Sequence, residues 1–260
     1  LGRASDQIAT PWGEIVDPEL VRQALRRKRY EAVTVAHNET STGVANPLRE
    51  IARVVREESE ALLLVDAVSS LAGLPLESDA WGLDFVFAGV QKGLATPPGL
   101  TVFTFSERAE AKAAAIPHRG YYGDLLRYRD KHREGGPITT AAVSIAWALD
   151  LALERLAREG MEARWARHAA MQHQTADWAA ARGFTFASAA NGRSATVSCL
   201  RPPEGLPARA LVAALERRGY TLGGGYGQFK ESTFRIGHMR EVQTTDLAAL
   251  LAAIEEEIAS

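Results

Sequence analysis

The sequence Phe85-Val-Phe-Ala-Gly-Val-Gln-Lys92 begins as an apolar run and ends in a lysine, and the earlier run Leu62-Leu-Leu-Val65 is followed at once by Asp66. Short apolar runs bounded by polar or small residues predict buried strands. Residues 33–36 and 100–105 have the same character, and amphipathic helical patterns separate the earlier runs. Strands that alternate with helices predict an α/β fold with a mostly parallel sheet, in which ligands bind at the carboxyl ends of the strands. Asp66 and Lys92 are therefore expected at one edge of this sheet.

An acid and an amine at such an edge are what a pyridoxal 5'-phosphate site requires. Asp66 would lie beside the pyridine nitrogen and keep it protonated, so that the ring can accept the electrons released when a bond at the substrate's α-carbon breaks. Lys92 would bind the cofactor's aldehyde as a Schiff base and later carry a proton. Either residue alone is also typical of an ordinary strand end or a protein surface, so the prediction depends on the pair.

Five motifs occur in an order that resembles class V aminotransferases of the alanine–glyoxylate and serine–pyruvate type. They are His37-Asn-Glu-Thr-Ser-Thr-Gly43, Leu64-Val-Asp-Ala-Val-Ser-Ser70, Gly89-Val-Gln-Lys-Gly-Leu94, Pro97-Pro-Gly-Leu100 and Phe234-Arg-Ile-Gly-His-Met239. The resemblance extends from about residue 17 to the C-terminus. It implies a pyridoxal phosphate-dependent transferase of fold type I that moves an amino group from a small amino acid, such as alanine, serine or aspartate, to a small 2-oxo acid, such as glyoxylate or pyruvate. Family members begin with a segment that holds a phosphate-binding turn, and we expect this N-terminal segment to be missing from the 260 residues.

Two domains are predicted. Residues 1–157 are expected to form a large cofactor-binding domain that includes the start of a linking helix, and residues 158–260 a small C-terminal α+β domain. Two long helical patterns mark the change, one over residues 140–158 and one that ends near residue 182. Earlier helix starts are indicated by Asp17-Pro18 and Asn46-Pro47, in which a capping side chain precedes a proline.

The resemblance implies further site residues. Thr40 would bind the cofactor's phenolic oxygen, Val68 would pack against the ring face opposite the substrate, and Gln91 would contact the phosphate. Arg235 would bind the substrate carboxylate, because a planar guanidinium can make two parallel charge-assisted hydrogen bonds to it. The alternative roles are a turn residue for Thr40, core packing for Val68 and a surface side chain for Arg235.

Thr139 aligns best with the place where a neighbouring subunit of the family reaches the cofactor phosphate. Gly136 and Ala141 depart from the family pattern around it. The resemblance thus implies a homodimer with active sites at the interface, since a two-fold contact would supply both sites at once.

Composition excludes several other classes. The formal net charge of −2 provides no basic surface for a nucleic acid or an anionic membrane. One cysteine excludes an internal disulfide and is typical of a reducing compartment, so a cytoplasmic location is expected. No apolar stretch is long enough to span a bilayer. His168 and His173 lack the spacing and acidic partner of a metal site, and no metal is predicted.

Two alternatives use the same fold. A cysteine desulfurase, another pyridoxal phosphate enzyme of fold type I, would need a mobile reactive thiol. Cys199, however, falls within an apparent strand at residues 196–200, which favours a buried and inert sulfur. A non-catalytic fragment or subunit of the same fold is the other alternative, because of the expected loss of the N-terminal segment.

Overall fold

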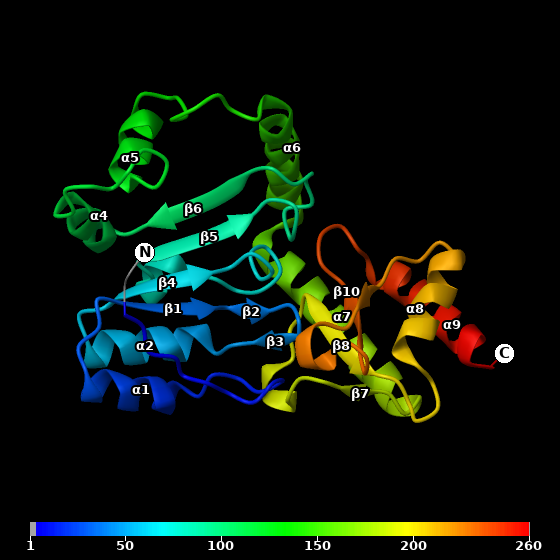
Figure 1. The fold of residues 1–260 in the computed structure, drawn as a ribbon. Coiled ribbons are helices and arrows are strands. Elements are labelled where there is room, and N and C mark those ends of the chain that lie inside the picture. Colours follow the sequence, from blue (N-terminus) through cyan, green and yellow to red (C-terminus); the bar gives the residue numbers. More distant parts are fainter. Residues whose placement is uncertain (1–3, 260) are drawn as a thin grey trace.

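The computed structural model describes residues 4–259, which contain two principal sheets joined by long helices (Figure 1). The strands are β1 Ala32–Ala36, β2 Asn38–Glu39, β3 Val44–Ala45, β4 Leu62–Asp66, β5 Phe85–Gly89, β6 Thr101–Phe105, β7 Thr185–Phe186, β8 Val197–Arg201, β9 Gly223–Gly224 and β10 Phe234–Gly237. The helices are α1 Pro18–Arg27, α2 Leu48–Glu58, α3 Ser78–Trp81, α4 Glu107–Ala114, α5 Leu125–Arg133, α6 Val143–Glu159, α7 Met161–Ala181, α8 Ala208–Arg217 and α9 Thr244–Ala259.

The first sheet has the strand order β1-β4-β5-β6. Strand β4 pairs parallel with both β1 and β5, as the alternation of strands and helices predicts. Strand β6 pairs antiparallel with β5, because the chain returns through a short connection without a crossover helix. The predicted mostly parallel α/β sheet is therefore confirmed, with one antiparallel edge strand.

The two faces of the first sheet have different surroundings. Along β4, Leu63 and Val65 are buried against a core that includes apolar residues of α1 and α2. Leu64 and Asp66 alternate with them and are half-buried. Because successive side chains of a strand point to opposite faces, Asp66 projects from the face away from α1 and α2.

The two predicted helix starts differ in their capping. Asp17 caps α1 as expected, since its side chain accepts a hydrogen bond from the Glu19 N–H and proline occupies the first helical position. The prediction for Asn46 was wrong, because α2 has no side-chain cap. Asn46 Oδ1 instead accepts from the Val16 N–H at 2.8 Å, and Asn46 Nδ2 donates to the Ala36 carbonyl at 2.8 Å. The Asn46 amide thereby ties the N-terminal segment to the end of β1.

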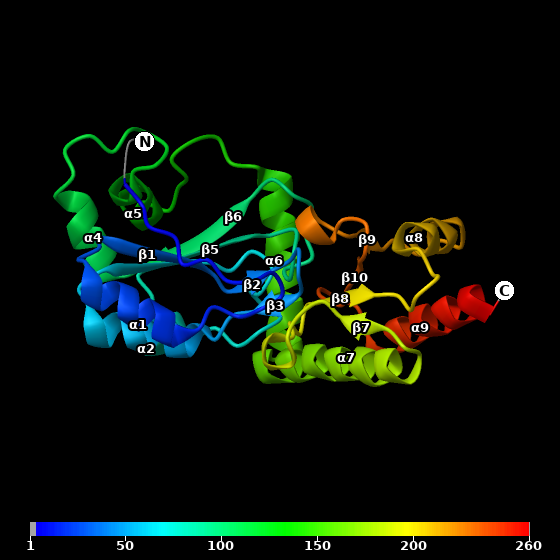
Figure 2. The ribbon, with the colours of Figure 1, turned by 60° about the horizontal axis from the view of Figure 1, so that its bottom comes forward.

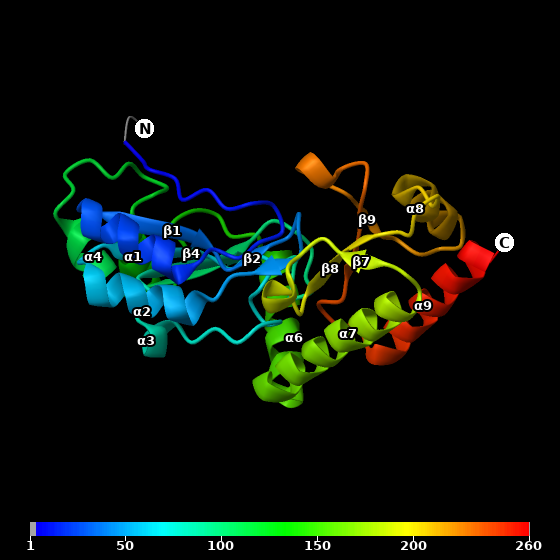
Figure 3. The same cartoon turned by 90° about the horizontal axis from the view of Figure 1, so that it is seen from below.

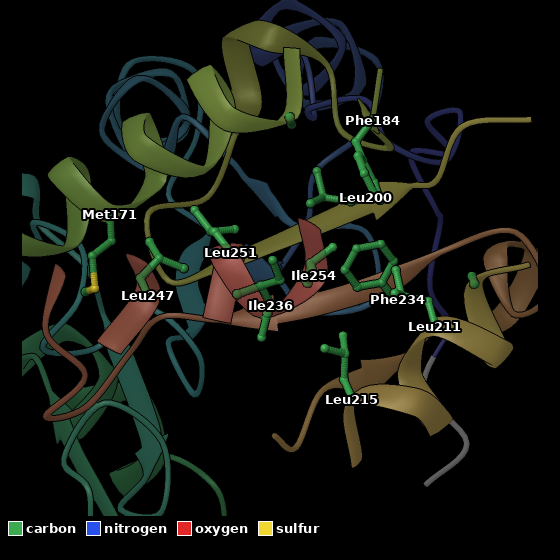
Figure 4. Close-up of a cluster of buried hydrophobic side chains, with 13 residues drawn as sticks. Met171, Phe184, Leu200, Leu211, Leu215, Phe234, Ile236, Leu247, Leu251 and Ile254 are labelled. Atoms are coloured by element: carbon green, nitrogen blue, oxygen red, sulfur yellow. The ribbon is translucent and has the colours of Figure 1, made fainter. Parts of the chain in front are cut away.

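The second sheet has the order β7-β8-β10-β9, with antiparallel pairing throughout. Strand β8 and strand β10 contribute apolar side chains to a core shared with α7, α8 and α9 (Figure 4). Phe234 lies within this core and is fully buried. Its ring meets that of Phe184 edge-on, with centroids 6.0 Å apart.

Helix α6 lies at the junction between the two sheets (Figures 1 and 2). Helix α7 follows directly after Gly160 and packs against α9 beside the second sheet (Figure 3). Both helices were predicted, although α6 begins at Val143 rather than residue 140. Within residues 4–259, no helix combines the length and apolarity needed to cross a bilayer.

Candidate active site

Asp66 ends β4 at the carboxyl edge of the first sheet. It is paired with Ala36 of β1 on one side and with Phe87 of β5 on the other. Its carboxylate oxygen Oδ1 accepts a hydrogen bond from the Val68 N–H at 2.8 Å. The half-buried carboxylate is thus held in one orientation by a backbone N–H of the turn that follows β4. Val68, two residues further on, is also half-buried.

Lys92 lies in the turn that follows β5, at the same edge as Asp66. Its carbonyl accepts from the Ala95 N–H at 3.0 Å, which closes the turn. The next residue, Gly93, is buried so closely that a Cβ built on it would lie 2.1 Å from the Leu71 carbonyl oxygen. Only glycine can occupy this position without displacing the backbone, so the lysine is followed by a point of close chain contact.

Gln91 lies beside Lys92, and its side chain folds back over the end of β5. A Cβ built on Gly89 would approach the Gln91 amide oxygen to 2.6 Å. Gly89 therefore leaves room for the Gln91 side chain. This arrangement places the amide at the strand end, where the resemblance implies a phosphate contact.

Thr40 belongs to a hydrogen-bonded group with Ser69 and Asn38. The Thr40 hydroxyl donates to Ser69 Oγ at 2.8 Å, and the Ser69 hydroxyl donates to the Asn38 carbonyl at 3.0 Å. Asn38 Nδ2 adds a second donor to Ser69 Oγ at 3.0 Å. Since a hydroxyl has one proton, the proton of Thr40 is engaged with Ser69 in this arrangement.

Arg235 brings the second sheet into contact with this group. It lies on β10, where its Nε donates to the Gly224 carbonyl at 2.9 Å. Its Nη1 donates to the Thr40 carbonyl at 3.2 Å. The structure therefore places Arg235 beside Thr40, although the two residues are 195 positions apart.

Thr139 is not brought into this group by any hydrogen bond within the described chain. It is exposed in the segment between α5 and α6. Its neighbour Ile138 is buried, and the Ile138 carbonyl accepts from the Tyr121 hydroxyl at 2.8 Å. Thr139 is thus accessible at the surface of the described chain.

His37 and Cys199 are both buried. Burial lowers the pKa of His37 to about 4, and its ring lies edge-on to that of Trp81. These surroundings are those of a structural histidine. Cys199 lies on β8 with no exposed surface, and burial raises the pKa of its thiol. A thiol held in this way lacks the exposure and thiolate character of a reactive cysteine, which disfavours the desulfurase alternative.

Sequence reasoning did not identify the contacts that hold the lysine turn. Arg240 Nη2 donates to the Gln91 carbonyl at 2.6 Å, and Arg164 Nη2 donates to the Gly93 carbonyl at 2.8 Å. No sequence signal could have found these contacts, because the acceptors are backbone carbonyls, which every residue possesses. In the sequence, Arg164 and Arg240 also look like ordinary arginines of an amphipathic helix and a surface loop, so the donors are not marked either.

An apolar cavity lies beside the turns that follow β4 and β5, where it is lined by Leu71, Ala72 and Leu94. It has a volume of about 640 Å³ and is bounded by α6 and by the turns after β4 and β5. Its lining contains none of the predicted site residues. We expect such a surface to pack against other protein rather than to bind a polar cofactor.

The residues at the sheet edge fit the polar groups of pyridoxal phosphate. A half-buried carboxylate, a lysine on the neighbouring strand end and a hydroxyl at Thr40 correspond to its ring nitrogen, aldehyde and phenolic oxygen. Across residues 4–259, no group of three or more His, Cys, Asp or Glu side chains could hold a metal ion.

Comparison with known proteins identifies similar chains. A family model described as aminotransferase class-V matches residues 9–226. The chain is 36% identical to the small subunit of soluble hydrogenase from Synechococcus sp. (strain PCC 6716), and the match covers 99% of this chain and 68% of that protein. It is 34% identical to serine–glyoxylate aminotransferase from Methylorubrum extorquens, over 94% of this chain and 63% of that protein.

A solved structure of alanine–glyoxylate aminotransferase from Nostoc sp. superposes with a TM-score of 0.88 at 31% identity, over 96% of this chain and 67% of that one. The chain thus spans about two thirds of the length of the proteins that it matches. A solved cysteine desulfurase from Thermococcus onnurineus NA1 superposes with a TM-score of 0.77, but at 16% identity this similarity shows the fold alone.

Proposed function

Because the chain belongs to the class-V aminotransferase family, we propose that the whole protein moves an amino group from a small amino acid, such as alanine, serine or aspartate, to a small 2-oxo acid, such as glyoxylate or pyruvate. The names of two similar proteins, serine–glyoxylate and alanine–glyoxylate aminotransferase, support this substrate class. The observation that carries the proposal is the position of Asp66 at the end of β4 and of Lys92 in the turn that follows the adjacent parallel strand β5.

The family fold is that of pyridoxal phosphate-dependent enzymes, and we assign pyridoxal 5'-phosphate as the cofactor of this protein. When bound, it supplies a ring that accepts electrons and an aldehyde that binds amino groups. Asp66 would keep the ring nitrogen protonated, and Val68 would exclude water from one ring face. Gln91 would bind the phosphate. Thr40 would bind the phenolic oxygen, which requires its hydroxyl to turn away from Ser69.

Lys92 would have two successive roles. It would first hold the aldehyde carbon covalently, and after the substrate displaces it the free amine would move a proton at the substrate's α-carbon. Arg235 would bind the substrate carboxylate and thereby orient the bond that breaks. Its present donor contact to the Thr40 carbonyl supports this role, because it directs the guanidinium of β10 toward the first sheet.

We further propose the domain division and the assembly. Residues 1–157 would form the cofactor domain and residues 158–260 the small domain, in agreement with the separate cores of the two sheets. The protein would act as a homodimer in which Thr139 of one subunit reaches the phosphate of the other. The exposure of Thr139 supports this contact. We also propose a cytoplasmic location, because the one cysteine of these 260 residues, Cys199, is buried and unpaired, which favours a reducing compartment.

The test uses the full-length protein incubated with pyridoxal 5'-phosphate. We expect a visible absorption band, and borohydride reduction followed by peptide mapping should place the adduct on Lys92. The Lys92→Ala variant should lose both the band and the turnover. Lys112→Ala is the matched control, since Lys112 lies on α4 and donates to the Glu31 carbonyl far along the sheet.

A screen of amino donors and oxo acid acceptors then defines the reaction. Turnover of small donors with glyoxylate or pyruvate would support the proposed substrate class. A protein that remains colourless with added cofactor, or one in which Lys92→Ala retains turnover, would show that the assignment of Lys92 is wrong.

A further inference from the structure

The backbone carbonyls of the two residues that flank Lys92, Gln91 and Gly93, accept hydrogen bonds from arginine side chains of the C-terminal part of the chain. On the N-terminal side, Arg240 Nη2 donates to the Gln91 carbonyl at 2.6 Å. On the C-terminal side, Arg164 Nη2 donates to the Gly93 carbonyl at 2.8 Å. Arg164 lies on α7 and Arg240 follows β10. The lysine backbone is thus held between two guanidinium groups that belong to different elements.

Arg164 also joins this turn to the segment that follows Asp66. Its Nε donates to the Ala72 carbonyl at 3.1 Å, so one guanidinium bridges the turn after β4 and the turn after β5. The side chain is 1% exposed. Two carboxylates balance its charge, since Arg164 Nη1 lies 2.7 Å from Glu159 and 3.2 Å from Glu241. A buried cation with this many satisfied donors has one defined orientation.

The backbone conformations around Lys92 are unusual. Between residues 4 and 259, the non-glycine residues with positive φ are Ala72, Ala95 and Arg240, at 64°, 59° and 71°. All three belong to the same set of contacts: the Ala72 carbonyl binds Arg164, the Ala95 N–H closes the lysine turn, and Arg240 binds Gln91. Left-handed conformations of non-glycine residues are unfavourable and persist where surrounding contacts hold them.

We propose that Arg164 and Arg240 are positioning residues for Lys92: they hold the turn of residues 90–95 so that the lysine amine stays directed at the edge where Asp66 lies. This inference rests on the proposed function of Lys92. The physical reason is the length of the lysine side chain. Four methylene groups leave the amine many positions, and a backbone fixed on both sides removes one source of that freedom. The alternative is that the arginines merely attach α7 and β10 to the first sheet.

Two variants test the inference in the full-length protein. Arg240→Ala removes an exposed donor, so the loss of the Gln91 contact has little effect on folding. Arg164→Lys keeps a positive charge for Glu159 and Glu241 but cannot reproduce a planar group that reaches both Ala72 and Gly93. Arg209→Ala is the matched control, because Arg209 is an exposed arginine of α8 whose partner is Glu231.

The first readout uses the cofactor-free protein. Hydrogen exchange at the amides of Ala95 and Thr96, which donate to the Lys92 and Val90 carbonyls, reports the order of the turn. We expect exchange at these two amides to accelerate about tenfold in both variants and to stay unchanged in Arg209→Ala.

The second readout uses the protein with pyridoxal 5'-phosphate. We expect the rate of borohydride-trapped adduct formation at Lys92, and kcat, to fall about tenfold or more in both variants while KM for the amino donor changes little, because a misplaced reacting group affects the chemical step. The pH midpoint of the visible absorption band should also shift. A lower thermal midpoint with unchanged adduct formation, kcat and absorption midpoint would overturn the inference in favour of simple attachment.

The two failures are distinguishable. If wild-type Lys92 forms no adduct, the proposed function is wrong and the inference is lost with it. If wild-type Lys92 forms the adduct and both variants behave as Arg209→Ala does, the inference alone is overturned.

Discussion

Replacement of His238 by asparagine should reduce the sensitivity of the protein to acid. The His238 ring is fully buried, and its Nδ1 lies 2.8 Å from the Ala195 carbonyl while Nε2 lies 2.9 Å from Ser198 Oγ. Because a carbonyl only accepts, Nδ1 must donate, and the neutral ring satisfies both contacts with Nε2 as acceptor. A proton on Nε2 would oppose its role as acceptor and place a charge in the interior. Burial accordingly lowers the pKa of His238 to about 4, from an ordinary value of 6.5.

The direction of the effect follows from proton linkage. Between pH 6.5 and pH 4 the unfolded chain binds a proton at His238 that the folded chain does not. Stability contributed by the neutral ring is therefore complete above pH 6.5 and is lost as the pH falls toward 4. Each pH unit over which only the unfolded chain holds this proton lowers the free energy of unfolding by about 1.4 kcal/mol. From pH 6.5 to pH 5 the loss is therefore about 2 kcal/mol.

The measurement is urea unfolding followed by tryptophan fluorescence at pH 7.5 and pH 5. Asparagine can still donate to the Ala195 carbonyl but does not titrate, so His238→Asn should lose about 2 kcal/mol less than the wild type between the two pH values. His37 and His168, whose pKa values burial also lowers to about 4, remain in both proteins and cancel in the comparison. If wild type and variant lose the same free energy between pH 7.5 and pH 5, the reasoning about His238 is wrong.

Two further predictions concern the second sheet. Phe234→Ala should lower the free energy of unfolding by about 3 to 5 kcal/mol, because it empties a fully buried site, whereas Trp147→Ala at a 74% exposed position should change it by less than about 0.5 kcal/mol; equal effects in urea unfolding would contradict the assignment of the core. Cys199 should resist a thiol reagent until denaturant is added, and Cys199→Ala should retain aminotransfer, since the thiol is buried with a raised pKa. Rapid labelling of the native protein, or loss of turnover in Cys199→Ala, would revive the thiol mechanism.

Much of the fold could be predicted from local patterns. The short apolar runs before Asp66 and Lys92 form adjacent parallel strands, and Asp17 caps α1. These features depend on neighbouring residues, whose spacing is visible in the sequence. The cap predicted at Asn46 failed because the same polar side chain could satisfy the backbone of Val16 and Ala36 instead. A local rule identifies a capable side chain but does not say which competing partner it meets.

The sequence by itself determined the α/β order of the first half, the acid and the amine at neighbouring strand ends, and the family. The tertiary structure alone decided that Arg235 reaches Thr40 and that Arg164 and Arg240 hold the peptides around Lys92. The last two contacts join residues 71 and 149 positions apart. Each ends on a backbone carbonyl, which every residue possesses, so the acceptor has no signature in the sequence. Such contacts arise only when folding brings one particular carbonyl within reach of a guanidinium.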